Sequence, residues 1–574
     1  MEEQSTNKTG VHQLLAGLKH HGVNYVVASP GSRNAPLSIA FNRDPHFHCF
    51  HIPDERSAGF YALGMAERSN SPVVLFCTSG SAVLNYYPAI AEAFYRNIPL
   101  IVISADRPKA WIDQGDGQTI RQDNVLEKHV AGFRNLLEMP ANDEQVWWNK
   151  RMVDELLILS KAKKAPIHFN FPFHEPLYGL ATKETEAPQK HISPASIQRS
   201  LASEELECLV HQWNNSPKRM IIVGQLPPSG RMRQLLENLS KDRSTAILVE
   251  NTSNVQFRDF IHCIDRTFNS IDGVAEKEFA PDLLITFGGA VVSKKIKAYL
   301  RRNKPKYHWN VSTQFPYMDT FQSLTAGIEM DELDFLDQFM QAQLDFSASR
   351  FGEQWKQLDY LIQDQHETVL SQLDYSDLTV FSLLMDAVPE NSHLHLGNSS
   401  VVRYAQLFDP ISSIRYYANR GTSGIDGSTS TAIGAALVDP TSLHTFISGD
   451  ISALYDSNAF WNKHIPSNFR MFVINNGGGG IFKIIPGPDG VEEQDDFFVA
   501  KQDFTMEHIC KAFSINYRKA TSLNEIDEQL NDFYSHQDNN RPVLMEIFTP
   551  FAENDKILKA YFSAIKVLPK TLLM

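Results

Sequence analysis

Cysteine is scarce in this chain, and its five residues never form a C-x-x-C pair (Cys49, Cys77, Cys208, Cys263 and Cys510). This spacing matches neither a zinc site nor a disulfide framework, and it fits a reducing cytoplasm. No apolar run reaches the roughly 18 residues that a membrane-spanning helix needs, and the acidic start Met-Glu-Glu-Gln-Ser has no apolar signal region. We therefore expect a cytoplasmic protein without membrane insertion.

Basic residues are the minority, because 53 Lys and Arg stand against 67 Asp and Glu and leave a net charge of −14. Such an acidic chain is not expected to bind nucleic acid or membrane surfaces in general. Any cluster of arginines is informative against this background. The hydrophobic content of 43% is sufficient for several cores, and the length of 574 residues corresponds to three or four domains.

Short apolar strands alternate with helical stretches along the whole chain, which is typical of an α/β protein with doubly wound parallel sheets. We predict three such domains, at residues 1–181, 195–345 and 353–574, with a polar linker at Thr182–Pro194. The strands expected in the first domain are Tyr25–Ser29, Phe47–Ile52, Val73–Thr78 and Leu100–Ser104, and the helices are Asn7–His20, Pro36–Phe41, Arg56–Arg68 and Ala82–Arg96. The strands expected later are Met220–Gly224, Ala246–Glu250, Leu283–Gly288, Tyr307–Val311, Leu394–Leu396, Ile414–Ala418, His444–Ser448, Phe469–Ile474 and Val543–Phe548.

Two polar loops follow predicted strands in the last third of the chain. Gly449-Asp450-Ile451 comes after one strand, and Asn475-Asn476 followed by Gly477-Gly478 comes after the next. Strand ends at one edge of a parallel sheet lie side by side, so a carboxylate, an amide oxygen and a backbone carbonyl can form an all-oxygen site for Mg²⁺. Two ordinary turns rich in Asp and Asn are the alternative interpretation. The pattern resembles the diphosphate–metal motif of thiamine-diphosphate enzymes.

Glu55 stands where a predicted strand gives way to the helix Arg56–Arg68. Thiamine diphosphate reacts at its C2 carbon, and its aminopyrimidine removes the C2 proton only when a carboxylic acid is hydrogen-bonded to the ring nitrogen N1′. An apolar cleft keeps such an acid protonated. The alternative is that Asp54 caps the helix and Glu55 complements the helix dipole. Together with the metal motif, we predict the catalytic role for Glu55.

Several arginines lie in loops of the first and last domains, most of them just after strands. They are Arg33, Arg107, Arg121, Arg403 and Arg420. Arginine forms two parallel hydrogen bonds with a carboxylate. Their shared placement in an acidic protein predicts substrates that carry several carboxylates. For each arginine taken alone, an ion pair at the surface or between domains is the alternative.

Seven segments in chain order resemble the 2-succinyl-5-enolpyruvyl-6-hydroxy-3-cyclohexene-1-carboxylate synthase family, thiamine-diphosphate enzymes of menaquinone biosynthesis. They are Pro30–Pro36, Asp54–Arg56, Thr78–Gly80, Ala105–Pro108, Gly397–Arg403, Asn419–Gly427 and Gly449–Asp456. The resemblance covers essentially the whole length. It implies that the chain joins 2-oxoglutarate to isochorismate with loss of CO₂. Both substrates are dianions, which agrees with the arginines.

The resemblance also assigns roles to individual residues. It implies that Ser399, Arg403 and Arg420 hold 2-oxoglutarate with Gln118 nearby, and that isochorismate is received by Ser32, Arg33, Arg107, Lys294 and Lys295. It implies that Asp450, Asn476 and the Gly478 carbonyl ligate Mg²⁺ or Mn²⁺. The coenzyme site implied by the resemblance comprises Glu55, Ser79, Gly80, Ile425, Gly449, Ile451, Ser452, Ile481, Phe482 and Ile485, with Ile425 as the apolar support that bends the coenzyme. Glu55, Gln118, Arg403 and Arg420 are the catalytic candidates.

Two positions depart from related patterns. The family often has arginine where this chain has Lys295, and lysine lacks the two-pronged geometry of arginine. Ile451 replaces the third glycine of the general Gly-Asp-Gly motif, and it fits this synthase family better than pyruvate decarboxylases.

The resemblance further implies at least a homodimer, with a homotetramer also open, in which Glu55 of one chain faces Asp450 of the partner subunit. Two rival interpretations stay open. One is another thiamine-diphosphate-dependent decarboxylase or carboligase that acts on a different 2-oxo acid. The other is a catalytically silent regulator built on the same fold.

Overall fold

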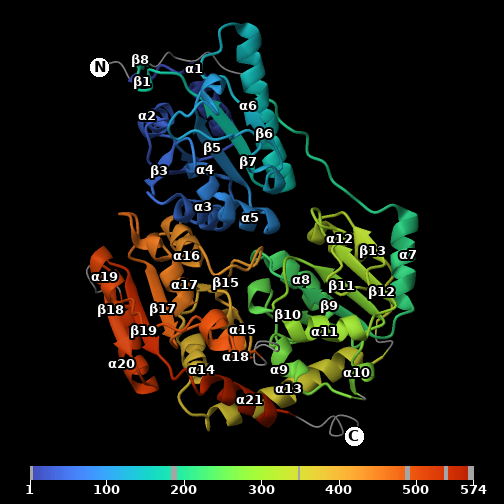
Figure 1. The fold of residues 1–574 in the computed structure, drawn as a ribbon. Helices are drawn as coiled ribbons and strands as arrows, with labels where there is room; N and C mark the ends of the chain where they lie inside the picture. The colour runs from blue at the N-terminus through green and yellow to red at the C-terminus, as the bar shows by residue number, and fades with distance from the viewer. Residues whose placement is uncertain are drawn as a thin grey trace.

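A computed structural model of the chain describes residues 4–182, 190–273, 275–346, 349–484, 491–535 and 541–566. Three sheets dominate the fold, with six, five and six strands, and every strand pair within them is parallel (Figure 1). The predicted α/β class with three parallel sheets is confirmed. Each sheet lies inside one of the three predicted residue ranges, whose limits remain a prediction. Part of the predicted linker, residues 183–189, lies outside the described residues.

The first sheet has the strand order β3-β2-β4-β5-β7-β6. Its strands are β2 Tyr25–Ala28, β3 His48–His51, β4 Val73–Cys77, β5 Leu100–Asp106, β6 Phe133–Asn135 and β7 Ile167–Pro172. The helices of this part are α1 Thr9–His20, α2 Ala35–Arg43, α3 Glu55–Ser69, α4 Ala82–Asn85, α5 Tyr87–Tyr95 and α6 Asp143–Lys163, with short 3-10 turns at Lys109–Trp111 and Glu127–His129. Every residue of the central strands β4 and β5 is buried, because helices cover both faces of the sheet. A separate antiparallel pair joins β1 Gln4–Thr6 to β8 Leu180–Thr182.

The second sheet has the order β10-β9-β11-β12-β13. Its strands are β9 Arg219–Val223, β10 Thr245–Val249, β11 Leu283–Phe287, β12 Tyr307–Val311 and β13 Ala326–Ile328. Its helices are α7 Ser203–Asn214, α8 Gly230–Leu239, α9 Ile264–Phe268, α10 Ala275–Glu278, α11 Lys294–Arg302 and α12 Glu332–Phe339, with a 3-10 turn at Asn251–Ser253. The long helix α13 Phe351–Leu370 then leads to the last part of the chain.

The third sheet has the order β15-β14-β16-β17-β19-β18. Its strands are β14 His393–Leu396, β15 Arg415–Tyr417, β16 His444–Gly449, β17 Phe469–Asn475, β18 Asn516–Ala520 and β19 Val543–Phe548. Its helices are α14 Asp377–Ala387, α15 Ser400–Ala405, α16 Ser428–Leu437, α17 Asp450–Tyr455, α18 Ile481–Ile484, α19 Glu507–Phe513, α20 Leu523–Tyr534 and α21 Asn554–Ala564, with a 3-10 turn at Ser457–Phe460 and a π-helical turn at Gln494–Phe498. Among the described residues, no helix combines the length and the apolar character needed to cross a bilayer.

The predicted helix Ala82–Arg96 is divided in the structure. Helix α4 ends at Asn85 and α5 begins at Tyr87, with Pro88 in its first turn. Proline lacks a backbone N–H and its ring collides with the preceding turn, so a continuous helix is interrupted there. The Tyr86 hydroxyl donates to the Phe76 carbonyl oxygen at 2.9 Å and anchors the break beneath β4.

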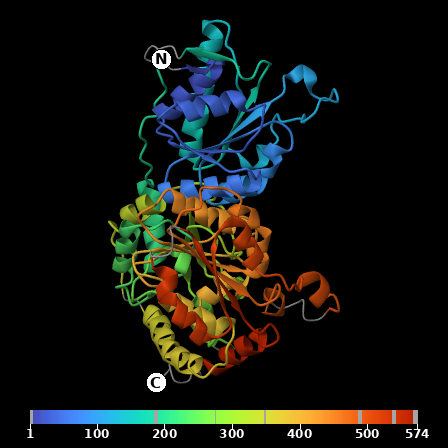
Figure 2. The same ribbon diagram turned by 90° about the vertical axis from the view of Figure 1, so that its left-hand side faces the viewer.

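Helix α3 of the first domain packs directly on α16 of the last domain (Figures 1 and 2). Two glycines make this approach possible. A Cβ on Gly64 would lie 1.9 Å from the Thr431 carbonyl oxygen, and one on Gly434 would lie 2.2 Å from the Tyr61 carbonyl oxygen. The hydrophobic core around α3 is therefore continuous with that around α16. The first and last domains share one packed interface within a single chain.

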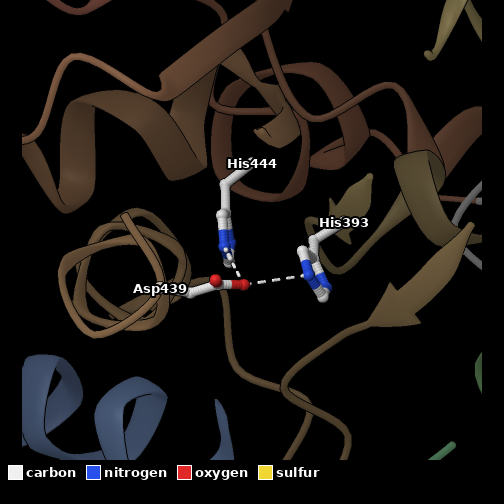
Figure 3. A group of neighbouring side chains, drawn as sticks. All are labelled: His393, Asp439 and His444. Atoms are coloured by element: carbon white, nitrogen blue, oxygen red, sulfur yellow. Dashed lines mark hydrogen bonds and ion pairs between the residues drawn. The ribbon is translucent and has the colours of Figure 1, made fainter. Parts of the chain in front are cut away.

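A buried polar group ties the same two domains together at the amino-terminal ends of β14 and β16 (Figure 3). One carboxylate oxygen of Asp439 lies 3.1 Å from His393 Nε2 and 3.3 Å from His444 Nε2. Three such side chains could also hold a metal ion. However, Arg68 of α3 donates from Nε to the same oxygen at 2.7 Å, so a guanidinium already balances the Asp439 charge. We interpret the group as a structural hydrogen-bond network in which Arg68 joins the first domain to Asp439 of the last domain.

Candidate active site

The two predicted metal-binding loops meet in the structure. Strands β16 and β17 are neighbours, and Gly449 is in register with Ile474, so Asp450 lies beside the end of β17. The buried Asp450 carboxylate accepts hydrogen bonds from the backbone N–H of Gly478 at 2.9 Å and from Gln502 Nε2 at 2.7 Å. Burial raises the pKa of Asp450 to about 6, although these donors oppose the rise. A bound cation would restore the charged form.

Asn476 offers a second oxygen to the predicted metal site. Its Oδ1 atom is buried and has no hydrogen-bond partner among the described residues, whereas its Nδ2 donates to Asp377 Oδ2 at 2.9 Å. A buried amide oxygen without a partner is unfavourable by about 1–3 kcal/mol. Gly478 has a φ of 152°, a conformation that favours glycine. Asp450, Asn476 and Gly478 thus fit the oxygen-rich site that Mg²⁺ requires.

The loop that carries Ile425 is joined to the metal-type loop. Ser452 Oγ, in the first turn of α17, donates to the Ile425 carbonyl oxygen at 2.6 Å. This bond places the predicted apolar support next to Gly449–Ser452. On the other side, Ile481 is buried and Phe482 packs against Phe498 with ring centroids 5.9 Å apart. Ile485, which we also predicted to wall the site, lies outside the described residues.

Glu55 is the first residue of α3. Its neighbour Asp54 caps this helix, as the alternative interpretation expected. The Asp54 side chain accepts from the Ser57 backbone N–H at 3.1 Å. Glu55 itself is half-buried, and burial raises its pKa even though a hydrogen bond from Asn85 lowers it. Capping by Asp54 and a protonated Glu55 are therefore compatible.

Ser79 and Gly80 follow β4 on the same edge of the first sheet. Gly80 has a φ of 89°, and its N–H donates to Gln122 Oε1 at 2.9 Å. A Cβ on Gly80 would lie 3.2 Å from Gln118 Cα, so the predicted catalytic Gln118 sits directly beside this turn. Gln122, fully buried, was not predicted. The sequence alone does not indicate a role for Gln122, because its side chain contacts a segment 42 residues away in the chain.

Arg33 and Arg107 come together in the first domain. Arg33 donates to the Phe173 carbonyl oxygen at 3.0 Å, and Arg107 donates to the Gly117 carbonyl oxygen at 3.1 Å. Burial lowers the pKa of Arg33, and the positive charge of Arg107 lowers it further. Each arginine also has an acidic neighbour, because Arg33 lies 3.1 Å from Glu175 and Arg107 lies 3.4 Å from Asp116. An anionic ligand would compete with these carboxylates for the guanidinium groups. Ser32 is exposed in the adjoining turn.

Arg121 does not join this pair. It forms an exposed ion pair with Asp113, with Nε and Oδ2 at 2.8 Å. For this arginine the structure agrees with the alternative interpretation, an ion pair at the surface.

Arg403 and Arg420 converge in the last domain. Arg420 donates to Asn398 Oδ1 at 2.8 Å, and Arg403 donates to the carbonyl oxygen of Ser399, whose φ of 70° is strained for a serine. Burial lowers the pKa of both guanidinium groups. The Nε atom of Arg420 is buried and has no hydrogen-bond partner among the described residues. Arg420 is buried and Arg403 is half-buried, and such a pair of guanidinium groups suits a dicarboxylate.

The second domain contributes charged groups that we did not predict. Glu250, at the end of β10, lies near Arg403 and Arg420 and influences the pKa of both. Lys297 is near the same two arginines, and burial lowers its pKa. No sequence motif indicates a role for Glu250 or Lys297.

The two lysines predicted for isochorismate are placed differently from each other. Lys295 extends over the Phe562 ring, 3.7 Å from its centroid, and it also contacts Asn269 Oδ1 at 3.4 Å. Lys294 is exposed. The structure therefore brings neither ammonium group to Arg33 by a described contact, and their binding role stays a prediction.

Residues 8–126 match the family described as thiamine pyrophosphate enzyme, N-terminal TPP binding domain, and residues 187–396 match the middle domain of thiamine pyrophosphate enzymes. Relatives named 2-succinyl-5-enolpyruvyl-6-hydroxy-3-cyclohexene-1-carboxylate synthase occur in Flavobacterium johnsoniae (43% identity, 95% of this chain and 96% of the relative), Christiangramia forsetii (42%, 95% and 96%) and Porphyromonas gingivalis (37%, 98% and 98%). The chain belongs to the 2-succinyl-5-enolpyruvyl-6-hydroxy-3-cyclohexene-1-carboxylate synthase family of thiamine-diphosphate enzymes.

Proposed function

We propose that this chain is a transferase of menaquinone biosynthesis that decarboxylates 2-oxoglutarate and adds the remaining four-carbon unit to isochorismate. One observation carries the proposal: the Asp450–Asn476–Gly478 group is joined by the Ser452–Ile425 hydrogen bond to the loop that bears Arg420. The loop proposed to bind the metal and the loop proposed to bind the dicarboxylate are thus hydrogen-bonded to each other.

Asp450, Asn476 and the Gly478 carbonyl would hold Mg²⁺ or Mn²⁺, and Gly449, Ile451 and Ser452 would lie against the diphosphate. The buried Asn476 Oδ1 and the raised pKa of Asp450 support this assignment. When bound, thiamine diphosphate supplies a carbon nucleophile and an electron sink for decarboxylation. Ile425, Ile481, Phe482 and Ile485 would exclude water from the coenzyme.

Glu55 would act as a protonated acid that donates a hydrogen bond to the coenzyme ring, with Ser79, Gly80 and Gln118 beside it. Burial raises the pKa of its carboxyl group and so favours the protonated form. The buried neighbours of Glu55, Cys77 and Tyr86, keep water away from this end of α3.

Arg403, Arg420 and Ser399 would bind the two carboxylates of 2-oxoglutarate, because Arg420 is buried, Arg403 is half-buried, and Arg403 is close enough to lower the pKa of Arg420. Arg33, Arg107 and Ser32 would receive the carboxylates of isochorismate. Positive charge at the ring carboxylate stabilises the negative charge that develops when the conjugated carbon is attacked. Lys294 and Lys295 are weaker candidates for the same substrate, because Lys295 already contacts Phe562.

The catalytic unit would be a homodimer in which Glu55 of one chain faces Asp450 of the partner subunit. Within one chain the start of α3 contacts the far end of α17: Arg56 donates to the Tyr455 carbonyl oxygen at 2.7 Å, whereas Asp450 begins that helix. Large apolar side chains near these elements are exposed, namely Leu84, Tyr455 and Trp461. Such exposed apolar groups favour burial against a second copy. Association of two dimers into a tetramer is a further possibility that sedimentation can decide.

The decisive experiment incubates the purified protein with thiamine diphosphate, Mg²⁺, 2-oxoglutarate and isochorismate, and identifies the product by mass. We expect the succinyl adduct and CO₂, with neither formed when the coenzyme is left out. Pyruvate in place of 2-oxoglutarate is the matched control. Efficient use of pyruvate would favour another carboligase, and no CO₂ from either 2-oxo acid would favour a silent regulator.

A further inference from the structure

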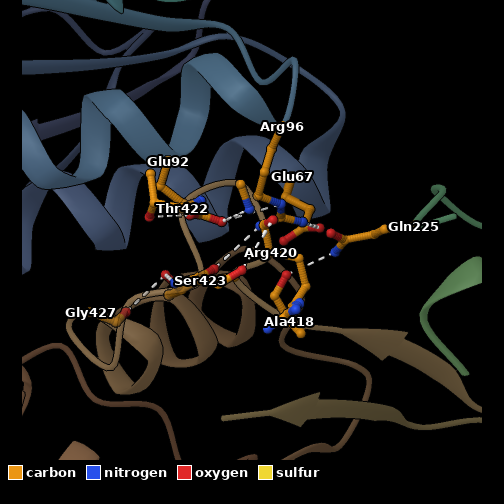
Figure 4. Close-up of polar contacts among 12 residues, drawn as sticks. Glu67, Glu92, Arg96, Gln225, Ala418, Arg420, Thr422, Ser423 and Gly427 are labelled. Carbon is orange, nitrogen blue, oxygen red and sulfur yellow. Dashed lines mark hydrogen bonds and ion pairs between the residues drawn. The ribbon is translucent and has the colours of Figure 1, made fainter. Parts of the chain in front are cut away.

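Glu92 of helix α5 reaches from the first domain into the Arg420 loop of the last domain (Figure 4). Its carboxylate accepts the backbone N–H of Gly421 at 2.8 Å, the backbone N–H of Thr422 at 2.6 Å and the Thr422 hydroxyl at 2.8 Å. Glu92 is only 1% exposed. A single buried carboxylate therefore holds the two residues that follow Arg420.

Arg96, one turn further along α5, holds the residue that precedes Arg420. It donates to Asn419 Oδ1 at 3.3 Å, and its Nε lies 3.8 Å from the Glu92 carboxylate. Glu67 of α3 forms a second ion pair with Arg96 and completes a buried row of alternating charges. Such a row is rigid because each charged group depends on its neighbour for compensation.

Close packing restricts the backbone conformation of the Arg420 loop on both of its sides. A Cβ on Gly421 would lie 2.7 Å from the Glu92 carbonyl oxygen, so only glycine permits this approach of the loop to α5. On the far side, Asn398 Nδ2 donates to the carbonyl oxygens of Asn419 at 2.7 Å and Gly424 at 2.6 Å. The same Asn398 accepts from Arg420 through Oδ1. The backbone on both sides of Arg420 is thus fixed by the first domain and by Asn398.

We propose that Glu92 is a positioning residue that presents Arg420 to the dicarboxylate substrate. This inference rests on the proposed function, because it takes 2-oxoglutarate as the ligand of Arg420. Glu92 is almost fully buried and so has no surface for a ligand, and it acts through the two amides that follow Arg420. The α3–α16 interface already joins the domains through packed glycines, so the Glu92 contacts are not needed merely to hold the domains together.

The test compares Glu92→Gln with Thr422→Val. Glutamine keeps the shape, but its amide nitrogen must face an N–H donor, so one loop amide loses its acceptor. We expect the KM for 2-oxoglutarate to rise about tenfold or more in Glu92→Gln, as for loss of a charge-assisted hydrogen bond, with less than about a twofold change for isochorismate. Thr422→Val keeps both backbone bonds and should raise the same KM only about two- to fivefold.

A second readout does not depend on turnover. Hydrogen exchange of the peptide across Ala418–Gly427 should quicken in Glu92→Gln and stay unchanged in Thr422→Val. Glu144→Gln, an exposed glutamate at the start of α6, is the matched control and should leave both the exchange and the KM values as they are.

The outcomes separate the two proposals. Unchanged exchange and an unchanged 2-oxoglutarate KM in a folded Glu92→Gln protein would overturn the positioning role. An equal rise in KM for both substrates would also overturn it, because that pattern indicates a general loss of domain packing. If Glu92→Gln does not fold, an unaltered 2-oxoglutarate KM in Thr422→Val decides against the role. If the wild-type protein makes no adduct while Glu92→Gln still loosens the loop, the proposed function fails and the structural link stands.

Discussion

Asp377 holds one end of the Asn476 amide, which we propose as a metal ligand, and its removal gives a quantitative prediction. Asp377 begins α14 and is buried, with Oδ2 accepting from Asn476 Nδ2 at 2.9 Å and Oδ1 accepting from Thr549 Oγ1 at 2.6 Å. The carboxylate therefore decides which end of the Asn476 amide faces Asp377 and leaves Oδ1 for the metal. Partners of metal ligands commonly have this orienting role.

The magnitude follows from the bond that is lost. In Asp377→Ala the Asn476 amide loses a hydrogen bond to a charged group, which contributes about 1.5–3 kcal/mol, and removing such an outer partner lowers metal affinity about 10- to 100-fold. In Asp377→Asn the acceptor is kept but its charge is lost. We expect that variant to weaken Mg²⁺ binding by about fivefold or less, in keeping with a neutral bond of about 1 kcal/mol.

The assay is calorimetric titration of Mg²⁺ into protein that is saturated with thiamine diphosphate. Asp386→Ala is the matched control, because Asp386 is an exposed aspartate on the same helix α14. Thermal unfolding confirms that each variant is folded. A folded Asp377→Ala protein that binds Mg²⁺ as tightly as the wild type would show that Asn476 needs no orienting partner or does not bind the metal, and the reasoning would be refuted.

Three further predictions concern the coenzyme, the substrate and pH. Glu55→Gln should lower kcat about 100-fold or more without loss of the fold, and near-normal product formation would remove Glu55 from its role. Arg403→Ala should raise the KM for 2-oxoglutarate, and a change confined to isochorismate would reverse the two substrate sites. Burial lowers the pKa of His393 to about 3, whereas the unfolded chain binds that proton near pH 6.5. Unfolding therefore takes up a proton between these values, and stability falls as the pH falls through this window, by up to about 1.4 kcal/mol per pH unit. His393→Gln should reduce the slope of the free energy of unfolding against pH, measured by urea unfolding at pH 4–7. An unchanged slope would contradict a buried, neutral His393.

The approach of the two polar loops could be predicted because each loop directly follows a recognisable strand. Asp450 follows β16 and Asn476 follows β17, and neighbouring parallel strands bring their carboxyl ends together. The same logic placed Arg420 in the loop after β15, whereas Arg403 lies in helix α15 and not in a loop. Periodicity also located most strands to within one or two residues, since buried parallel strands are nearly continuous apolar runs.

Other features depend on contacts between domains and leave no local pattern. Glu92 meets Gly421 across 329 positions of sequence, and Glu250 reaches the arginines from a different sheet. In the sequence each is an ordinary acid, on a helix or at a strand end. The break at Pro88, in contrast, could have been predicted from the proline alone. Arg121 resembled the other arginines in placement, but its side chain is 81% exposed, whereas Arg33 and Arg420 are buried.

The close packing of α3 on α16 has a consequence for how the chain tolerates being cut. Ile197 lies in the exposed segment between the first two sheets, with 84% of its surface accessible. A protease that cleaves there would separate the two helices covalently, yet their interlocked backbones would keep the fragments associated. The nicked protein should migrate as one species in native electrophoresis and as two in denaturing gels.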